Sequence, residues 1–379
     1  RINQFEDALF KGMMLLEKII FSIKKIVKLT KMELGIYSFV EMDPQGTGNK
    51  GIEGHKRMQE LMEEIVLAEQ VGLDVFAIGE HHRADYLVSS PAVVLAAASQ
   101  KTSIIKLSSA VTVLSSDDPV RVFQDFATVD LLSKGRAEIM AGRGSFIESF
   151  PLFGYDLKDY DELFTEKLEL LLKINAAEKV SWQGKLRPSI NNLGIYPRPF
   201  QNQIPIWVAV GGTPESLMRA GQLGLPMALA IIGGSPQRFK QLVQLYRESF
   251  KAADHTHPST VGINSHVFIG DDSTKAADDF YPSYATTMTR IGRERGWGPM
   301  NRMQFDMMRQ KEGSLIVGNP QEVIDKILYE YELFENDRFL AQMTVGPIDH
   351  KKLMRSIELF GTVVAPAVRK FTKSQLQNA

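Results

Sequence analysis

From residue 32 onward, short apolar runs alternate with longer stretches whose apolar residues recur every three or four positions. Short apolar runs are typical of β-strands buried on both faces, and the longer period is typical of amphipathic α-helices. The pattern predicts strands at residues 34–39, 75–79, 105–114, 137–141, 206–210, 226–232, 261–269 and 338–345. It predicts helices at residues 55–71, 91–100, 119–132, 161–175, 215–222, 236–253, 321–333 and 350–368.

The order of these elements, strand then helix, indicates the fold class. Strand–helix alternation implies parallel strands joined by right-handed crossovers, and eight such units close a barrel. Two segments break the alternation. Residues 180–204 hold several prolines and predict an inserted hairpin or loop, and residues 273–310 predict an irregular helical insertion. We therefore predict an α/β fold, a (β/α)8 TIM barrel with insertions after strands 4 and 7.

The chain divides into three parts on this reading. Residues 1–31 predict a basic amphipathic helix, with Met13 to Leu29 as its most hydrophobic stretch, broken by lysines. Such a helix could lie on a membrane surface or pack on a partner. Because a strand-like run starts directly after Met32, we instead interpret residues 1–31 as an appended or upstream-translated leader outside the fold. Residues 32–370 form a single predicted domain, and residues 371–379 a C-terminal tail.

Composition excludes several classes of function that depend on strong charge, cysteine or a membrane span. The formal net charge is -1, which gives no global field for nucleic acid or an acidic membrane. The chain has no cysteine, so disulfides, thiolate catalysis, iron–sulfur clusters and thiolate zinc sites are excluded. No apolar run reaches the ~18 residues of a membrane span. We expect a cytoplasmic protein.

The segment Glu80-His81-His82 follows the second predicted strand directly. In a parallel barrel, residues at the carboxyl ends of strands line the active site. The cluster is therefore either catalytic or a buried polar group with a structural role. A third possibility is a metal site, but adjacent residues alternate faces on a strand, so His81 and His82 are poorly placed to share one ion. We predict no metal.

Two glycine-containing loops also follow predicted strands. In Gly142-Arg143-Gly144-Ser145, small residues would let a ligand approach the backbone, and Arg143 could pair with a phosphate. The alternative is a tight turn with a solvated arginine.

The second loop is Gly211-Gly212-Thr213-Pro214-Glu215-Ser216, between a predicted strand and helix. Pro214 suits the first helical position. The amides of Gly212 and Thr213 and the hydroxyls of Thr213 and Ser216 would then face an anion at a helix N-terminus, unless this is an ordinary capped helix start. Because barrels often hold a phosphate on a late loop, we favour a phosphate site.

Further motifs occur in a specific order between these loops and after them. They are Asp118-Pro119-Val120-Arg121, Ser133-Lys134-Gly135-Arg136, Phe153-Gly154, Gly224-Leu225-Pro226-Met227 and Ser356-Ile357-Glu358-Leu359-Phe360. With Glu80-His81-His82 and the two glycine loops, the chain from Met32 to about Lys370 resembles the bacterial luciferase-like family of flavin-dependent monooxygenases.

The resemblance implies FMN at the carboxyl end of the barrel. It implies that His81 serves the oxygen chemistry, tuned by Glu80 near the flavin. Arg143 and the loop Gly211–Ser216 would hold the flavin phosphate, and Ala110-Val111 would run beside the isoalloxazine ring. The sequence departs from the family at Asp161, where relatives can carry a second phosphate-binding arginine, and at Gly212, which replaces a glutamate.

We therefore expect a two-component monooxygenase. A separate NAD(P)H-dependent flavin reductase would supply reduced FMN, which reacts with O₂ and a small organic substrate. The irregular segment at residues 273–310 could act as a lid that keeps water out. The alternatives are a non-catalytic FMN-binding flavoprotein and a deazaflavin-dependent oxidoreductase of the same fold. The resemblance also implies a homodimer.

Overall fold

The computed structural model describes residues 32–378 apart from 44, 45 and 47. The predicted leader at residues 1–31 lies outside the described residues. Within the described part, eight parallel strands form a closed ring in which each strand pairs with its neighbours in chain order, and β10 and β12 complete the ring to β1. These strands are β1 (Glu33–Ser38), β2 (Val75–Ile78), β3 (Lys106–Ser109), β5 (Ala137–Gly142), β8 (Ile206–Val210), β9 (Met227–Ile231), β10 (Val261–Ile269) and β12 (Arg338–Gln342).

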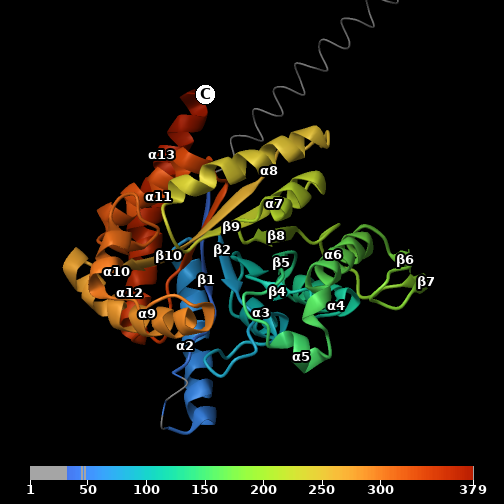
Figure 1. The fold of residues 1–379 in the computed structure, drawn as a ribbon, viewed down its shortest axis with the longest axis horizontal. Coiled ribbons are helices and arrows are strands. Elements are labelled where there is room, and N and C mark those ends of the chain that lie inside the picture. Colours follow the sequence, from blue (N-terminus) through green and yellow to red (C-terminus); the bar gives the residue numbers. More distant parts are fainter. Residues whose placement is uncertain (1–31, 44–45, 47, 379) are drawn as a thin grey trace, which may run out of the picture.

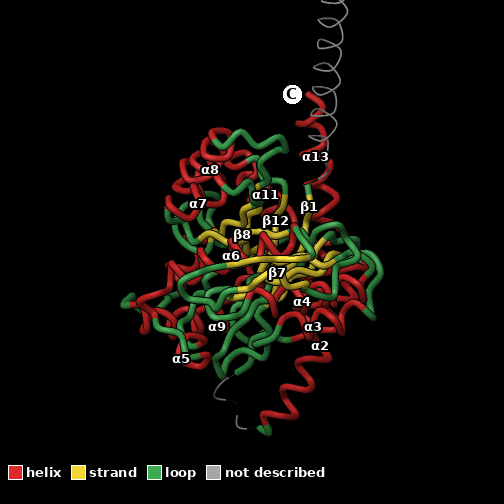
Figure 2. Tube along the Cα trace, turned by 90° about the vertical axis from the view of Figure 1, so that its right-hand side faces the viewer, coloured by secondary structure: helices red, strands yellow, loops and turns green. Residues whose placement is uncertain are grey.

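The structure confirms the predicted TIM barrel. Helices surround the strands (Figure 1), and the view turned by 90° shows the same arrangement of strands inside and helices outside (Figure 2). The helices that follow the strands are α2 (Lys50–Gln70), α3 (Pro91–Ser99), α4 (Pro119–Ser133), α6 (Tyr160–Ala176), α7 (Pro214–Gln222), α8 (Lys240–Ala252), α11 (Pro320–Phe334) and α12 (His350–Leu359).

Both predicted insertions are present. After β5, the antiparallel hairpin β6 (Lys179–Trp182) and β7 (Ile190–Gly194) lies outside the barrel. After β10, the chain forms α9 (Ser273–Arg295) and α10 (Arg302–Arg309). The sequence analysis missed the short strand β11 (Ile316–Gly318), which pairs with the end of β10, and the five-residue helix α5 (Ser149–Phe153).

Two predicted elements are longer or less regular than expected. The third strand, predicted over residues 105–114, is divided into β3 and β4 (Thr112–Val113), and the peptide bond between Ala110 and Val111 is cis. The last helix, predicted to end at Val368, continues through a π-helical turn (Phe360–Val364) into α13 (Ala365–Asn378).

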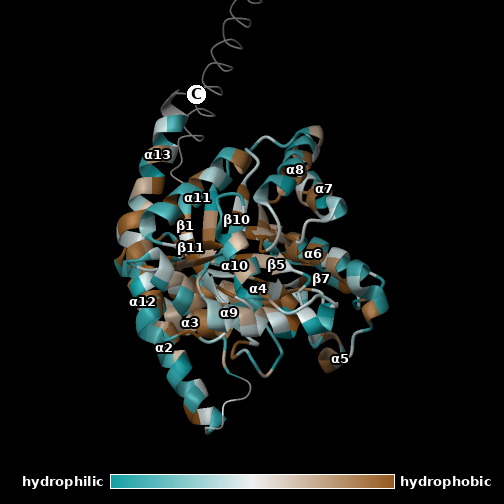
Figure 3. Ribbon diagram, turned by 60° about the vertical axis from the view of Figure 1, so that its left-hand side comes forward, coloured by the Kyte–Doolittle hydropathy of each residue, from teal (hydrophilic) through white to brown (hydrophobic). Residues whose placement is uncertain are grey.

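Apolar side chains of the described residues form three clusters, one of them around Phe268, Phe280 and Phe305 at the α9–α10 insertion and the other two in the barrel. The larger lies between the strands and the surrounding helices, and the smaller lies inside the barrel around Tyr37, Met140, Trp207 and Leu340. Figure 3 shows the strands mostly brown and the outward sides of the helices mostly teal. No helix in the described part is long and apolar enough to cross a membrane.

A buried ion cluster closes the amino end of the barrel. Arg338, at the start of β12, donates to the carboxylates of Glu33 and Glu138, and its guanidinium lies 4.1 Å from the centre of the Trp207 ring. Lys106 adds a second cation to the same carboxylates. These side chains fill the amino end, so we expect a ligand site at the carboxyl end of the strands.

Candidate active site

Glu80 links the loop after β2 to the short strand β4. Its Oε1 lies 2.9 Å from Nε2 of His82, and its Oε2 accepts a hydrogen bond of 2.8 Å from the amide of Val113 in β4. The Glu80 carboxylate thus contacts His82 directly, and it has no hydrogen bond to the ring of His81. That Glu80 tunes His81 stays a prediction.

His81 lies in a cage of aromatic rings. Its ring centre is 4.3 Å from that of Phe39, 4.3 Å from that of Tyr86 and 5.3 Å from that of Phe146. Both ring nitrogens are buried and have no hydrogen-bond partner. Burial, with the nearby positive groups of His82 and Arg83, lowers the pKa of His81 to about 3, so the imidazole is neutral at physiological pH.

An unpartnered imidazole in an apolar cage costs free energy. Neutral imidazole carries one N–H donor and one acceptor nitrogen. Such a group is suited to make hydrogen bonds with a polar ligand in the mouth of the barrel. The apolar cage disfavours the protonated, positively charged form of His81.

The predicted phosphate residues come together on the opposite side of the mouth. Arg143, directly after β5, donates a hydrogen bond of 2.9 Å to the hydroxyl of Ser216, and that hydroxyl lies 2.8 Å from the hydroxyl of Thr213. Arg143 also donates a bond of 2.6 Å to Asp161. The structure thus joins one glycine loop to the other. At the position where relatives can carry an arginine, the exposed Asp161 forms an ion pair with Arg143.

The start of α7 is open to an anion. Thr213 is the N-cap and Pro214 the first helical residue, but the Thr213 side chain makes no capping bond to the first turn. Gly212 has a φ of +92°, a left-handed conformation that favours glycine, and a Cβ at Gly211 would meet no atom within 4 Å. Pro214 has no N–H and the Ser216 amide donates to the Thr213 carbonyl at 3.1 Å, so the Glu215 amide is the first-turn donor left for an anion beside Arg143.

The short strand β4 connects the two halves. Val113, which bonds to Glu80, pairs with Gly142, and Gly142 immediately precedes Arg143. The side chain of Val111 lies where a Cβ on Gly142 would be, at 2.7 Å. We call His81 with its aromatic neighbours the histidine cage, and Arg143 with Thr213 and Ser216 the anion cluster, because it is suited to bind an anion. Both lie at the same end of the barrel, with Ala110-Val111 between them.

The helix α9 contacts the loops on the cage side. Arg83 donates to Glu294 of α9 at 2.9 Å and to Glu148 at 2.8 Å. Arg290 pairs with Asp85, and Arg295 donates to the carbonyl of Ser145 at 3.0 Å. We call these contacts the α9 latch. They are the arrangement that a lid over the barrel mouth would need.

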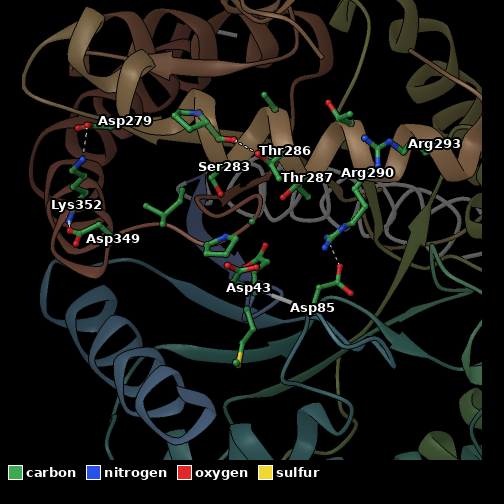
Figure 4. A pocket seen from close by; sticks show the side chains of 18 residues that line it. Asp43, Asp85, Asp279, Ser283, Thr286, Thr287, Arg290, Arg293, Asp349 and Lys352 are labelled. Atoms are coloured by element: carbon green, nitrogen blue, oxygen red, sulfur yellow. Dashed lines mark hydrogen bonds and ion pairs between the residues drawn. The ribbon is translucent and has the colours of Figure 1, made fainter. Parts of the chain in front are cut away.

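A cavity of about 740 Å³ lies under the same helix. Its walls come from α9, the loop after β1 and the loop after β12 (Figure 4). Among the described residues, no group of three or more His, Cys, Asp or Glu side chains is placed to hold a metal ion.

Sequence reasoning missed several residues of the site. Phe39, Tyr86 and Phe146 form the cage, but each follows a strand in an irregular loop, where no periodicity indicates which way a side chain points. Glu41, which lines the cavity, has no motif around it. A search for aromatic residues within a few positions of each predicted strand end would have found the cage.

The sequence model of the luciferase-like monooxygenase family matches residues 32–335. This chain belongs to that family. The family includes FMN monooxygenases and F420-dependent oxidoreductases, so the luciferase-like protein described here is an oxidoreductase of a flavin-type cofactor family.

Curated relatives of this luciferase-like protein cover most of its length. It is 27% identical over 324 residues to the uncharacterized protein y4vJ of Sinorhizobium fredii, with 82% of this chain and 91% of the relative covered. It is 26% identical over 336 residues to the alkanal monooxygenase alpha chain of Photorhabdus laumondii, with 82% and 92% covered. Over 52% of this chain and 61% of the relative, it is 26% identical to an F420-dependent glucose-6-phosphate dehydrogenase of Amycolatopsis mediterranei.

Solved structures share the fold. The monooxygenase RslO1 from Streptomyces bottropensis matches with a TM-score of 0.77 at 21% identity, covering 88% of this chain and 99% of that one. The oxygenating constituent of 3,6-diketocamphane monooxygenase from Pseudomonas putida, in complex with FMN, matches with a TM-score of 0.70 at 19% identity, covering 89% and 98%. An F420-dependent secondary alcohol dehydrogenase matches with a TM-score of 0.68 at 18% identity, covering 89% and 99%.

Proposed function

We propose that this protein is an FMN-dependent monooxygenase that uses reduced FMN and O₂ on a small organic substrate. The observation that carries the proposal is the joining of Arg143, Thr213 and Ser216 at the open N-terminus of α7. An arginine, two hydroxyls and a free helix amide are groups that bind a phosphate monoester. The unpartnered His81 at the same end of the barrel supplies a polar group where a reacting ring would need one.

The residues present fit the cofactor. Arg143, Gly211, Gly212, Thr213 and Ser216 would hold the phosphate, and the Ala110-Val111 segment would lie along the ring. When bound and reduced, FMN supplies the electrons that activate O₂.

The chain's own residues provide the environment for that chemistry. Phe39, Tyr86 and Phe146 keep water from the imidazole, and the neutral His81 holds a proton on one ring nitrogen and offers it in a hydrogen bond. Glu80 fixes β4, and with it the position of the Ala110-Val111 segment. The α9 latch covers the mouth during turnover.

The partners follow from the same proposal. This chain is the oxygenase, and a separate NAD(P)H-dependent reductase delivers the reduced flavin. A homodimer is supported by an exposed apolar set on neighbouring elements, namely Val93 of α3, Ile104 and the pair Leu131 and Leu132 of α4. Sedimentation at micromolar concentration should give twice the mass of one chain.

The first prediction tests the phosphate site. Binding of FMN and of riboflavin, which lacks the phosphate, is followed by flavin fluorescence. Arg143→Ala should weaken FMN binding several-fold, roughly the loss of one charge-assisted hydrogen bond, and leave riboflavin unchanged. Arg121→Ala, an exposed arginine on α4, is the matched control and should change neither.

Equal losses of FMN affinity and riboflavin affinity would show that Arg143 acts through the fold and not on the phosphate.

The same titration with F420 tests the alternative of a deazaflavin-dependent enzyme, since the ligand that binds more tightly identifies the cofactor. Formation of an oxygenated product from an added substrate, with NADH, O₂, FMN and a flavin reductase, separates an enzyme from a flavoprotein that only binds FMN, because the reductase alone consumes NADH without making this product.

A further inference from the structure

The cavity under α9 has a polar wall built from one face of that helix. Asp279, Ser283, Thr287 and Arg290 recur every three or four positions of α9 and line it. In Figure 4, Ser283, Thr287 and Arg290 extend from the helix toward Asp43 and Asp85 on the opposite side. At about 740 Å³, the space is within the usual ~300–1,000 Å³ of small-molecule sites.

The charge of the lining is unbalanced. Five carboxylates line the cavity, and only three cationic groups do. Asp85 is paired with Arg290, and Asp279 is paired with Lys352 at 2.7 Å, so two of the cations are already neutralised within the protein. The excess of carboxylates disfavours an anionic ligand and favours a cation.

Glu41 is the most buried of these carboxylates. It is 5% exposed and accepts a hydrogen bond of 2.6 Å from the hydroxyl of Thr344. Burial raises the pKa of Glu41 to about 7, although the Thr344 hydroxyl and the nearby Arg57 favour the carboxylate, so Glu41 needs a further positive partner to stay fully ionised at neutral pH. An ammonium group beside it would provide that partner.

Glu41 also connects the cavity to the proposed reaction centre. It forms an isolated β-bridge with Tyr86, and the Tyr86 ring lies 4.3 Å from the ring of His81. The backbone of Glu41 is therefore joined to the residue whose ring contacts the imidazole. Met42, Pro282 and Ile348 supply apolar surface in the same lining.

We propose that this cavity binds a small organic amine, with the ammonium on Glu41 and the apolar part against Met42, Pro282 and Ile348. The proposal rests on the proposed function in one respect: the bound amine is then the substrate class of the oxidation. Neither Glu41 nor any other cavity residue belongs to the predicted phosphate site.

Binding is measured without flavin, by saturation-transfer NMR titration with hexylamine, 1-hexanol and hexanoate. These probes share one chain and differ in charge. Hexylamine should bind at least about tenfold more tightly than hexanoate, and Glu41→Gln should weaken hexylamine by about tenfold while leaving 1-hexanol unchanged. Glu248→Gln, on the exposed face of α8, is the control and should leave all three unchanged.

A second variant guards against misfolding of Glu41→Gln. Ala285→Trp places an indole in the cavity from α9 and leaves every lining carboxylate in the sequence, and it should abolish hexylamine binding. Hexanoate binding as tightly as hexylamine, or unchanged hexylamine binding in either folded variant, would overturn the proposal.

The two proposals fail separately. If FMN binds and depends on Arg143 but hexylamine does not bind, only the amine site is wrong. If hexylamine binds and depends on Glu41 but FMN does not bind, the proposed function is wrong and the amine site stands.

Discussion

At the scale of single residues, the Asp161 carboxylate competes with a bound phosphate for Arg143 of the anion cluster. Asp161 takes one side of the Arg143 guanidinium at 2.6 Å, while Ser216 takes the other. The Asp161 side chain is 73% exposed, so the ion pair is weak. The carboxylate nevertheless stands beside the place where a phosphate would bind, and like charges repel. A flavin held by this site would be released more readily than one held by two arginines, as a flavin shuttling from a reductase requires.

Asp161→Asn should therefore tighten FMN binding. An exposed pair contributes ~0.2–1 kcal/mol, so the dissociation constant should fall by about two- to fivefold. Riboflavin binding should not change, because it lacks the phosphate. Glu169→Gln, an exposed carboxylate farther along α6, is the control. An FMN affinity that falls in Asp161→Asn would show that Asp161 positions Arg143 for the phosphate instead of competing with it.

His81 makes a second prediction at this scale. His81→Ala should leave FMN binding within about twofold and lower the rate of coupled substrate oxidation by at least about tenfold, the lower range for a lost proton-handling group. His82→Gln keeps a hydrogen-bond donor for Glu80 and should retain most of the activity. Equal losses in both variants would mean that the segment acts through the position of β4.

The pH dependence of the oxidation rate tests whether His81 is a neutral imidazole. The pKa of His81 is about 3, so its charge does not change between pH 5 and 8 and should add no inflection to the rate in that range. An inflection near pH 6.5 that disappears in His81→Ala would contradict a caged, neutral imidazole.

At the scale of elements, α9 is held to the mouth by charged side chains, all of intermediate or high exposure except the buried Asp85. Arg83 bonds to Glu294 of α9 and to Glu148 before α5, while Arg290 of α9 pairs with Asp85. The pair of Arg83 with the exposed Glu294 contributes ~0.2–1 kcal/mol. Contacts of this size let a helix open and close within a catalytic cycle, and they are sensitive to salt.

Glu294→Gln should loosen the latch. Losing about 1 kcal/mol of closed-state stability raises the open fraction by about fivefold, and hydrogen peroxide released per NADH consumed should rise by a similar factor. FMN affinity should stay unchanged. Lys275→Gln, exposed at the other end of α9, is the control. Peroxide release that does not rise would show that α9 takes no part in excluding water.

The elements were predictable to different degrees. Strand β8 matches its predicted bounds, because a strand covered on both faces is an apolar run, here bounded by Pro205 and Gly211. Strand β10 also matches its predicted bounds, although Asn264, Ser265 and His266 interrupt its apolar residues. The division of β3 from β4 was not predictable, since Val111 to Leu114 continue the apolar pattern across the break. The strand β11 was missed because three residues carry no periodicity.

At the scale of the whole molecule, the barrel has a closed end and an open end. The ion cluster around Arg338 fills the amino end, and the histidine cage, anion cluster and cavity lie at the carboxyl end. The end of the barrel that holds the candidate site could be predicted from the sequence, because Glu80-His81-His82 and the two glycine loops each stand directly after a predicted strand. The partners of each side chain did not follow, since Glu80 with Val113 and Arg143 with Ser216 depend on contacts between separate loops.

The barrel contains a buried carboxylic acid that has no part in the proposed chemistry but affects the stability of the fold. Glu330 on α11 is 1% exposed and contacts the Ser265 hydroxyl of β10 at 3.1 Å. Burial raises its pKa to about 8, against an ordinary value near 4.5, while Ser265 and Lys326 oppose the rise. Between these two values the folded state keeps a proton that the unfolded chain releases. Its contribution to stability is therefore complete below pH 4.5 and is lost as pH rises toward 8.

Glu330→Gln keeps the shape and removes the titration. Relative to the parent, the free energy of unfolding should be nearly unchanged at pH 5 and higher by roughly 2 kcal/mol or more at pH 8, since each pKa unit corresponds to about 1.4 kcal/mol. Urea unfolding followed by circular dichroism at both pH values measures the difference. Glu332→Gln, exposed on the same helix, should stay within ~0.5 kcal/mol at both. A stabilisation that is equal at pH 5 and pH 8 would mean that the gain comes from packing, and that Glu330 is already ionised in the folded barrel.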